Sequence, residues 1–92
     1  MEPTLPTIHL NGTGAATLEA EYQAVRLAAT AAADKLVAAT LNLRDFYPQE
    51  PGNWEKAKAE RAEMLKALES VEAYAAAWEI HAAEQRRIRE GR

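Results

Sequence analysis

Apolar and small residues recur at alternating spacings of four and three between positions 17 and 43. The members of this repeat are Leu18, Tyr22, Val25, Ala29, Ala32, Leu36, Ala39 and Leu43. A strand alternates with a period of two and cannot produce such a heptad pattern, so the repeat predicts one long helix over residues 17–43. Its alanine centre predicts a partner helix that approaches closely at the middle.

A second helix with the same spacing is predicted over residues 54–89. Its seam is interrupted once by an arginine and comprises Ala57, Arg61, Met64, Leu68, Val71, Ala75, Trp78, Ala82 and Gln85. Between the two helices, Pro48, Pro51 and Gly52 oppose helix and Asn53 is a good N-cap, so residues 44–53 are predicted to form a turn. A connection this short forces the helices into an antiparallel hairpin.

The chain has too few large apolar residues for a comfortable core. It has 92 residues, of which 48% are hydrophobic, but 21 of these are alanines that bury little surface each. A lone hairpin would also leave a second apolar stripe in water, made of Leu27, Val37, Leu41, Leu65, Tyr74, Ile80 and Ile88. We therefore predict an all-α fold, an antiparallel two-helix hairpin (residues 17–92) with an extended N-terminal arm (residues 1–16), which assembles into a helical-bundle homo-oligomer.

The arm ends in a glycine loop that leads into the first helix. Pro3 and Pro6 oppose helix, and the sequence Asn11-Gly12-Thr13-Gly14 favours a turn because glycine admits positive φ. Thr17 is then predicted as the N-cap. Backbone N–H groups beside a hydroxyl at a helix start are typical of phosphate sites, although the same four residues also serve as a plain turn.

The interhelical turn carries the densest recognition chemistry of the chain. Arg44-Asp45-Phe46-Tyr47 places a guanidinium, a carboxylate and two aromatic rings directly before Pro48. In one interpretation the aromatic rings cover the end of the helical core and Arg44 pairs with Asp45 at the surface. In the other, an aromatic ring stacks on a flat ligand, Arg44 meets a phosphate and Asp45 contacts a base edge or a ribose hydroxyl.

Charge and composition exclude several classes of function. The net charge of −3 argues against a duplex nucleic-acid binder, and no apolar run is long enough to span a membrane. The chain has no cysteine, and residues 1–10 lack the basic region of a signal peptide, so we expect a cytoplasmic protein. The arginines near the end, Arg86, Arg87, Arg89 and Arg92, either complement the helix dipole or line an anion site.

Catalysis has little support in this sequence, and we expect no enzyme activity, no cofactor and no metal. The two histidines are His9 in the arm and His81 on the second helix. His81 and Glu84 have the spacing of two metal ligands on one helix, but no further ligand accompanies them. A half-exposed helical histidine is the better interpretation of His81.

Two short motifs resemble those of a known family. The segment His9-Leu10-Asn11-Gly12-Thr13 and the turn Arg44-Asp45-Phe46-Tyr47-Pro48 resemble those of small proteins from tailed phages and prophages, over about residues 5 to 80. In size and architecture the chain is also similar to phage proteins that sequester the nucleotide second messengers of bacterial immunity. The similarity in size and architecture implies an anti-defence protein that acts in the cytoplasm of the bacterial host.

We therefore expect a protein that binds an anionic, nucleotide-like small molecule without catalysis. Phosphate would be bound by Thr13, by the Gly12 and Gly14 backbone and by Arg44. Polar edges would be read by His9, Asn11 and Asp45, and Tyr47 would stack on the base.

The two motifs lie at opposite ends of an antiparallel hairpin, about 40 Å apart for helices of this length. We therefore expect the site to form between subunits of an antiparallel dimer. The alternatives are an interaction module that inhibits a host defence protein through the second apolar stripe, and a structural component of phage assembly.

Overall fold

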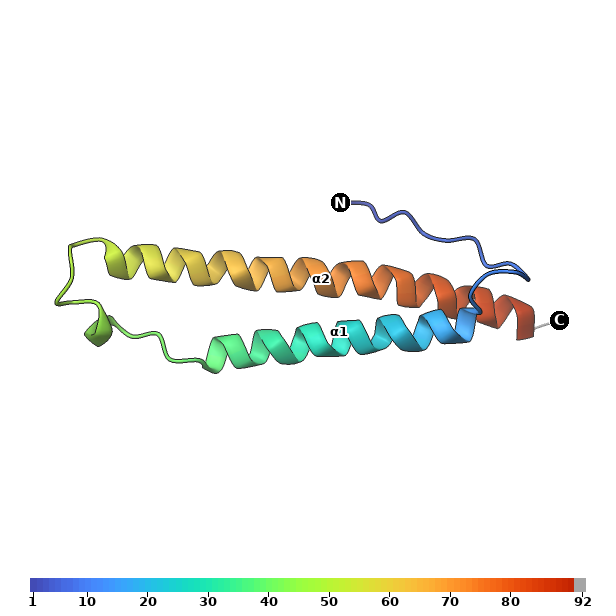
Figure 1. Cartoon of the computed structure of the whole chain (residues 1–92), viewed down its shortest axis with the longest axis horizontal. Helices are drawn as coiled ribbons and strands as arrows, with labels where there is room; N and C mark the ends of the chain where they lie inside the picture. The colour runs from blue at the N-terminus through green and yellow to red at the C-terminus, as the bar shows by residue number, and fades with distance from the viewer. Residues whose placement is uncertain (91–92) are drawn as a thin grey trace.

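The computed structural model describes residues 1–90, and Arg92 lies outside the described residues. Two long helices, α1 (Ala15–Ala38) and α2 (Asn53–Glu90), pack antiparallel, and a short 3-10 helix, η1 (Leu43–Asp45), lies in their connection (Figure 1). No strand occurs in this part of the chain. The all-helical hairpin predicted from the sequence is confirmed, and it forms a rod of 66 × 22 × 19 Å.

Helix α1 ends five residues earlier than predicted. The backbone of Ala39 is extended, with ψ at 138°, and its N–H returns to the carbonyls of Lys35 and Leu36. The guanidinium of Arg61 donates to the carbonyl of Ala39 at 2.7 Å and to that of Val37 at 3.5 Å. The arginine that interrupts the seam of the second helix therefore caps the carboxyl end of the first.

Helix α1 also begins earlier than predicted. Its N-cap is Gly14, whose carbonyl accepts the N–H of Leu18, so the prediction of Thr17 as the cap is wrong. The N–H of Gly12 closes a turn onto the carbonyl of His9, and neither Gly12 nor Gly14 uses the positive φ that glycine admits. Among the described residues, positive φ occurs at Gly52 alone (97°), directly before α2 begins.

The contact between the helices is built from small side chains. The buried hydrophobic residues among those described are all alanines, namely Ala15, Ala29, Ala75 and Ala82. Six members of the predicted seams are instead exposed, namely Val25, Ala32, Ala39, Leu43, Met64 and Val71. A straight helix turns every 3.6 residues and so drifts away from a strict heptad, which moves Arg26 and Glu79 into the interface beside the alanines.

An aromatic cluster packs between the helices in the half of the rod that lies nearer the N- and C-terminal ends of the hairpin. Tyr22 of α1 stacks on Trp78 of α2 with ring centroids 4.5 Å apart and planes 12° apart. Tyr74 leans against both rings at 6.4 Å and 6.2 Å. Because the neighbouring core residues are alanines, these rings supply most of the large apolar packing between the helices.

Candidate functional site

The candidate binding residues occupy the two tips of the rod. The glycine loop with His9, Asn11 and Thr13 lies at the end where α1 begins and α2 finishes, and the turn with Arg44, Asp45 and Tyr47 lies at the far end (Figure 1). The structure of a single chain therefore does not bring the two groups together, as the hairpin topology predicted. A site that uses both groups requires a second molecule.

The glycine loop leaves the start of α1 open. Gly14 has no side chain to cap the helix, and the first turn of α1 contains no acidic residue. Among residues 1–90, no capping side chain and no first-turn carboxylate therefore complements the positive end of the helix dipole there. The side chains of Asn11 and Thr13 are exposed beside this helix start.

His9 folds back over the loop. A Cβ added to Gly12 would lie 2.9 Å from His9 Nε2, so the imidazole ring occupies the space that a side chain at position 12 would need. A side chain at position 12 would have to displace this exposed ring, whereas the φ of Gly12 is not positive and places no demand on glycine. The ring stays exposed, within reach of a ligand at the loop.

The two aromatic rings of the turn have different environments. Phe46 is half-buried and packs on Trp54 at the start of α2, with ring centroids 5.8 Å apart. Tyr47 is 74% exposed and lines an open pocket of about 280 Å³ together with Leu43, Pro51 and Trp54. Phe46 thus serves the core, as one interpretation of the turn proposed, and Tyr47 remains available to stack on a ligand.

Arg44 and Asp45 are both exposed on η1. Among the described residues, Arg44 and Asp45 form no ion pair, either with each other or with another side chain. The surface pair between Arg44 and Asp45, which one interpretation of the turn proposed, is therefore absent from residues 1–90. Both charges stay hydrated and available.

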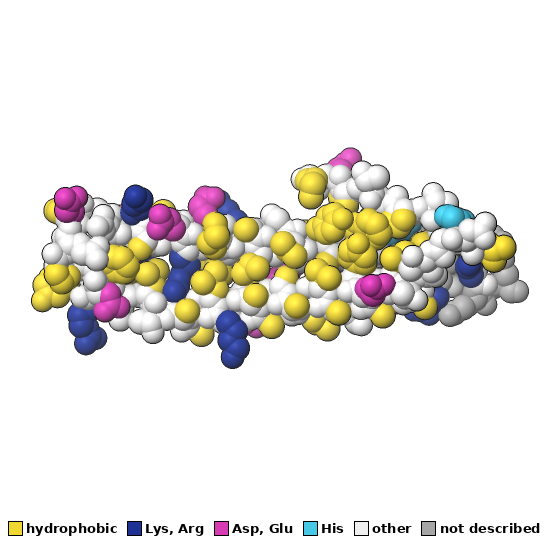
Figure 2. Space-filling model, viewed as in Figure 1, with side chains coloured by type: hydrophobic (Ala, Val, Ile, Leu, Met, Phe, Trp, Pro, Cys, Tyr) yellow, Lys and Arg dark blue, Asp and Glu magenta, His cyan; other side chains and the backbone are white. Residues whose placement is uncertain are grey.

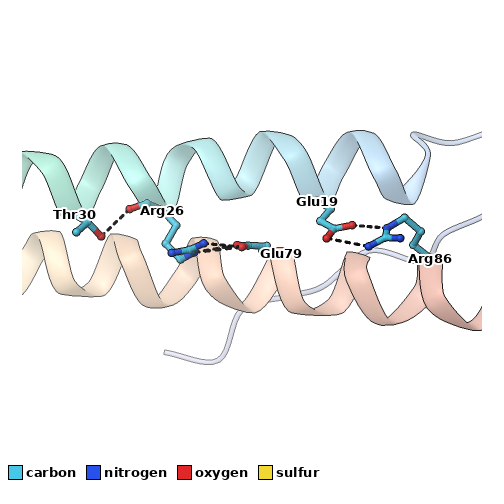
Figure 3. A network of polar contacts seen from close by, with 5 residues as sticks. All are labelled: Glu19, Arg26, Thr30, Glu79 and Arg86. Carbon is cyan, nitrogen blue, oxygen red and sulfur yellow. Dashed lines mark hydrogen bonds and ion pairs between the residues drawn. The ribbon is translucent and has the colours of Figure 1, made fainter.

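One C-terminal arginine has a structural role that the sequence did not reveal. Arg86 donates to Glu19 of α1 at 2.6 Å, and this hydrogen bond lowers the pKa of the Glu19 carboxyl below its usual value, with further help from the charge of Arg87 (Figure 3). Arg87 itself is exposed and lines an open pocket of about 400 Å³ with Glu84 and Ile88. Of these two arginines, Arg86 pairs with Glu19 of α1 and Arg87 is exposed to solvent.

A second ion pair joins the helices near the aromatic cluster. Arg26 donates to both carboxylate oxygens of Glu79, at 2.9 Å each, which raises the pKa of Arg26 (Figure 3). The register that places Glu19 opposite Arg86 also places Arg26 opposite Glu79, seven residues later on α1 and seven residues earlier on α2. The complementary signs at this spacing are the sequence signal that would have identified both pairs.

His81 anchors the N-terminal arm. Its Nε2 lies 2.8 Å from the carbonyl oxygen of Pro6, and the arm runs beside α2 until Met1 reaches Ser70 and Tyr74 (Figure 1). The sequence did not predict that the arm docks on α2. No cluster of three or more possible metal-ligating side chains exists in residues 1–90, and the half-buried position of His81 agrees with the expected helical histidine.

Within the described part of the chain, neither helix is long and apolar enough to cross a membrane. Comparisons with protein-family models, with curated proteins and with solved structures found no match to this chain. The site therefore has to be interpreted from its own geometry and chemistry.

Proposed function

We propose that this chain is a non-catalytic phage protein that binds and sequesters an anionic, nucleotide-type small molecule, such as a second messenger of bacterial immunity. One observation carries the proposal. The side chains suited to phosphate, base edge and ring are all exposed at the tips, whereas the ion pairs Arg26–Glu79 and Glu19–Arg86 are used to join the two helices.

The chemistry of the two tips is complementary. The glycine loop offers N–H groups of a helix start, the Thr13 hydroxyl and the Asn11 amide, which suit a phosphate and its neighbouring hydroxyl groups. The turn offers the guanidinium of Arg44 for a second phosphate and the ring of Tyr47 for a base. A nucleotide with more than one phosphate would use both tips.

In this proposal the protein is a homo-oligomer whose sites lie between subunits. The single chain exposes 6901 Å², whereas a compact protein of 10.1 kDa exposes about 5,300 Å². Its radius of gyration is 19.3 Å, against about 12 Å for a compact domain of this length. The excess is about 1,600 Å² per chain, or about 3,200 Å² for two chains, which lies in the range that obligate homodimer interfaces bury.

A second candidate function is an interaction module that inhibits a host defence protein. It is favoured by the large apolar side chains that the rod exposes, among them Leu27, Val37 and Ile80, which are 53%, 63% and 58% exposed. Under this alternative, replacing Leu27 or Tyr74 would weaken capture of a protein partner more than replacing Arg44 or Asn11. Under the main proposal the order is reversed for nucleotide binding.

Thermal-shift measurements against a panel of cyclic and linear nucleotides test the proposal. A ligand at one hundred times its dissociation constant adds about 2.7 kcal/mol to the free energy of unfolding, which is readily detected. Arg44→Ala and Thr13→Ala should each remove the shift, and Lys66→Ala, which deletes an exposed cation at mid-rod, should not. A flat response of the unmodified protein across the whole panel would refute nucleotide binding.

A further inference from the structure

The two long faces of the hairpin differ in chemistry. The ion pairs Glu19–Arg86 and Arg26–Glu79 lie on the same side of the groove between α1 and α2 (Figure 3). Leu18, Val25 and Trp78 each directly precede one of these charged residues, so they point about 100° away around their helix, to the other side of that groove. Apolar side chains follow the groove along the face drawn in Figure 2.

The apolar face, as we call it, consists of Leu18, Val25 and Ala32 on α1 and Met64, Val71 and Trp78 on α2. Val25 and Val71 are each 42% exposed and Met64 is 56% exposed. All of these residues belong to the heptad seams of the sequence. Trp78 stacks on Tyr22 and is half-buried, whereas Val25, Ala32, Met64 and Val71 remain exposed beside the helix contact. A heptad stripe left over after two helices have paired is the surface on which a further helical layer packs.

Val71 marks the middle of this face. It lies halfway along α2 (Asn53–Glu90), and the arm ends beside it, where Met1 lines an open pocket with Ser70, Val71 and Tyr74. The arm thus follows one half of α2 and leaves the other half uncovered (Figure 1). A rod with a free half and a covered half of equal length can pair with an inverted copy of itself without the two arms colliding.

We propose that a second copy of the chain packs face to face on the apolar face, antiparallel, with the two-fold axis passing beside Val71. Each α2 then lies on α2 of the other copy, so that Val71 meets its own equivalent and Met64 meets Trp78 of the second copy. A methionine against an aromatic ring is a favourable contact. The result is a four-helix bundle whose ion-pair faces remain in water.

This arrangement specifies the composite site and rests on the proposed function. An antiparallel two-fold axis at mid-rod brings the glycine loop of one protomer beside the turn of the other, at both ends of the bundle. Thr13 and Asn11 then come from one chain, and Arg44 and Tyr47 from its partner. The dimer holds two equivalent sites, and a single chain holds only halves.

Cysteine cross-linking tests the face, because the chain contains no cysteine of its own. Val71→Cys should be joined to its equivalent by a short bis-maleimide, whereas the control Thr30→Cys, on an exposed position of the ion-pair side, should remain a single chain. Val71→Glu should reduce the mass in solution from twice 10.1 kDa to 10.1 kDa with the helix content retained, and Thr30→Glu should not. Equal cross-linking of both cysteine variants, or an unchanged mass for Val71→Glu, would overturn the proposal.

Complementation tests the composite site separately. Thr13→Ala and Arg44→Ala dimers should each fail to bind a cyclic dinucleotide, and mixing them should restore binding, because a mixed dimer has one site with both residues intact. Cross-linking at Val71 without any nucleotide binding would uphold the dimer and refute the proposed function. Undiminished binding by a monomeric Val71→Glu chain would uphold the function and refute this arrangement.

Discussion

Replacement of Trp78 by alanine is the perturbation whose effect can be worked out most fully from the structure. Trp78 stacks on Tyr22 across the helix interface at 4.5 Å and contacts Tyr74 at 6.2 Å. Its Nε1 is buried without a hydrogen-bond partner in the described part of the chain, so truncation breaks no hydrogen bond that the structure provides. The expected loss is therefore one of apolar burial and ring stacking.

The magnitude follows from the area of the ring. Complete burial of a tryptophan removes about 200 Å² from water, which at about 25 cal/mol per Å² is about 5 kcal/mol. Trp78 is only partly buried, and the gap left beside alanines collapses easily, so we expect a loss of about 3 kcal/mol. A chain of this length has about 5 to 14 kcal/mol of stability in total, which makes this loss severe.

Urea unfolding followed by helical circular dichroism, at one fixed protein concentration, measures this loss. Trp78→Phe, which keeps a ring on Tyr22, should lose about 1 kcal/mol, and Ile88→Ala, at an exposed position near the end of α2, should lose less than that. A loss below about 1 kcal/mol for Trp78→Ala would show that the aromatic cluster does not hold the helices together.

Three further predictions concern the ends of the helices and their ion pairs. Arg61→Ala should lower the free energy of unfolding by about 1 kcal/mol because the carbonyls at the end of α1 lose their cap. Faster amide exchange at Ala39 would report this loss, and unchanged exchange would contradict the capping role. Arg86 lowers the pKa of Glu19, so the contribution of this carboxylate to stability is present above pH 4.5 and is lost as the pH falls through the folded-state pKa. Glu19→Gln should remove this part of the acid dependence of stability. Identical acid titrations of stability for Glu19→Gln and the unmodified protein would contradict this role of the ion pair. Gly52→Ala should lower the free energy of unfolding by about 1 to 2 kcal/mol, measured by thermal unfolding, because φ is positive at position 52. Gly14→Ala, at φ −66°, should change it little. Equal effects of the two substitutions would contradict the turn geometry.

The sequence predicted the hairpin because helical periodicity and a turn rich in proline are local signals. Pro51 and Gly52 placed the turn correctly, since glycine at that position admits the positive φ that the structure has. The end of α1 was not predictable in the same way. It depends on Arg61, which is distant in sequence and reaches the carbonyls of α1 only after the helices have paired.

At the two tips of the rod, too, contacts between distant segments could not be predicted from the sequence. Sequence chemistry singled out Arg44 and Tyr47, which are exposed, but it could not separate Tyr47 from Phe46, which packs on Trp54. It also did not reveal the docked arm, because the contact between Pro6 and His81 joins two residues that share no local pattern. Tertiary contacts of this kind follow from the register of the hairpin and from nothing in either segment alone.

The account depends on a rod whose buried residues are alanines and which completes itself with a second copy. Sedimentation equilibrium of the unmodified protein at micromolar concentration tests this most directly. We predict a species of twice 10.1 kDa that dissociates only on dilution. A fully helical, stably folded species of 10.1 kDa at all concentrations would contradict the account, because the apolar face and both half-sites would then remain in water.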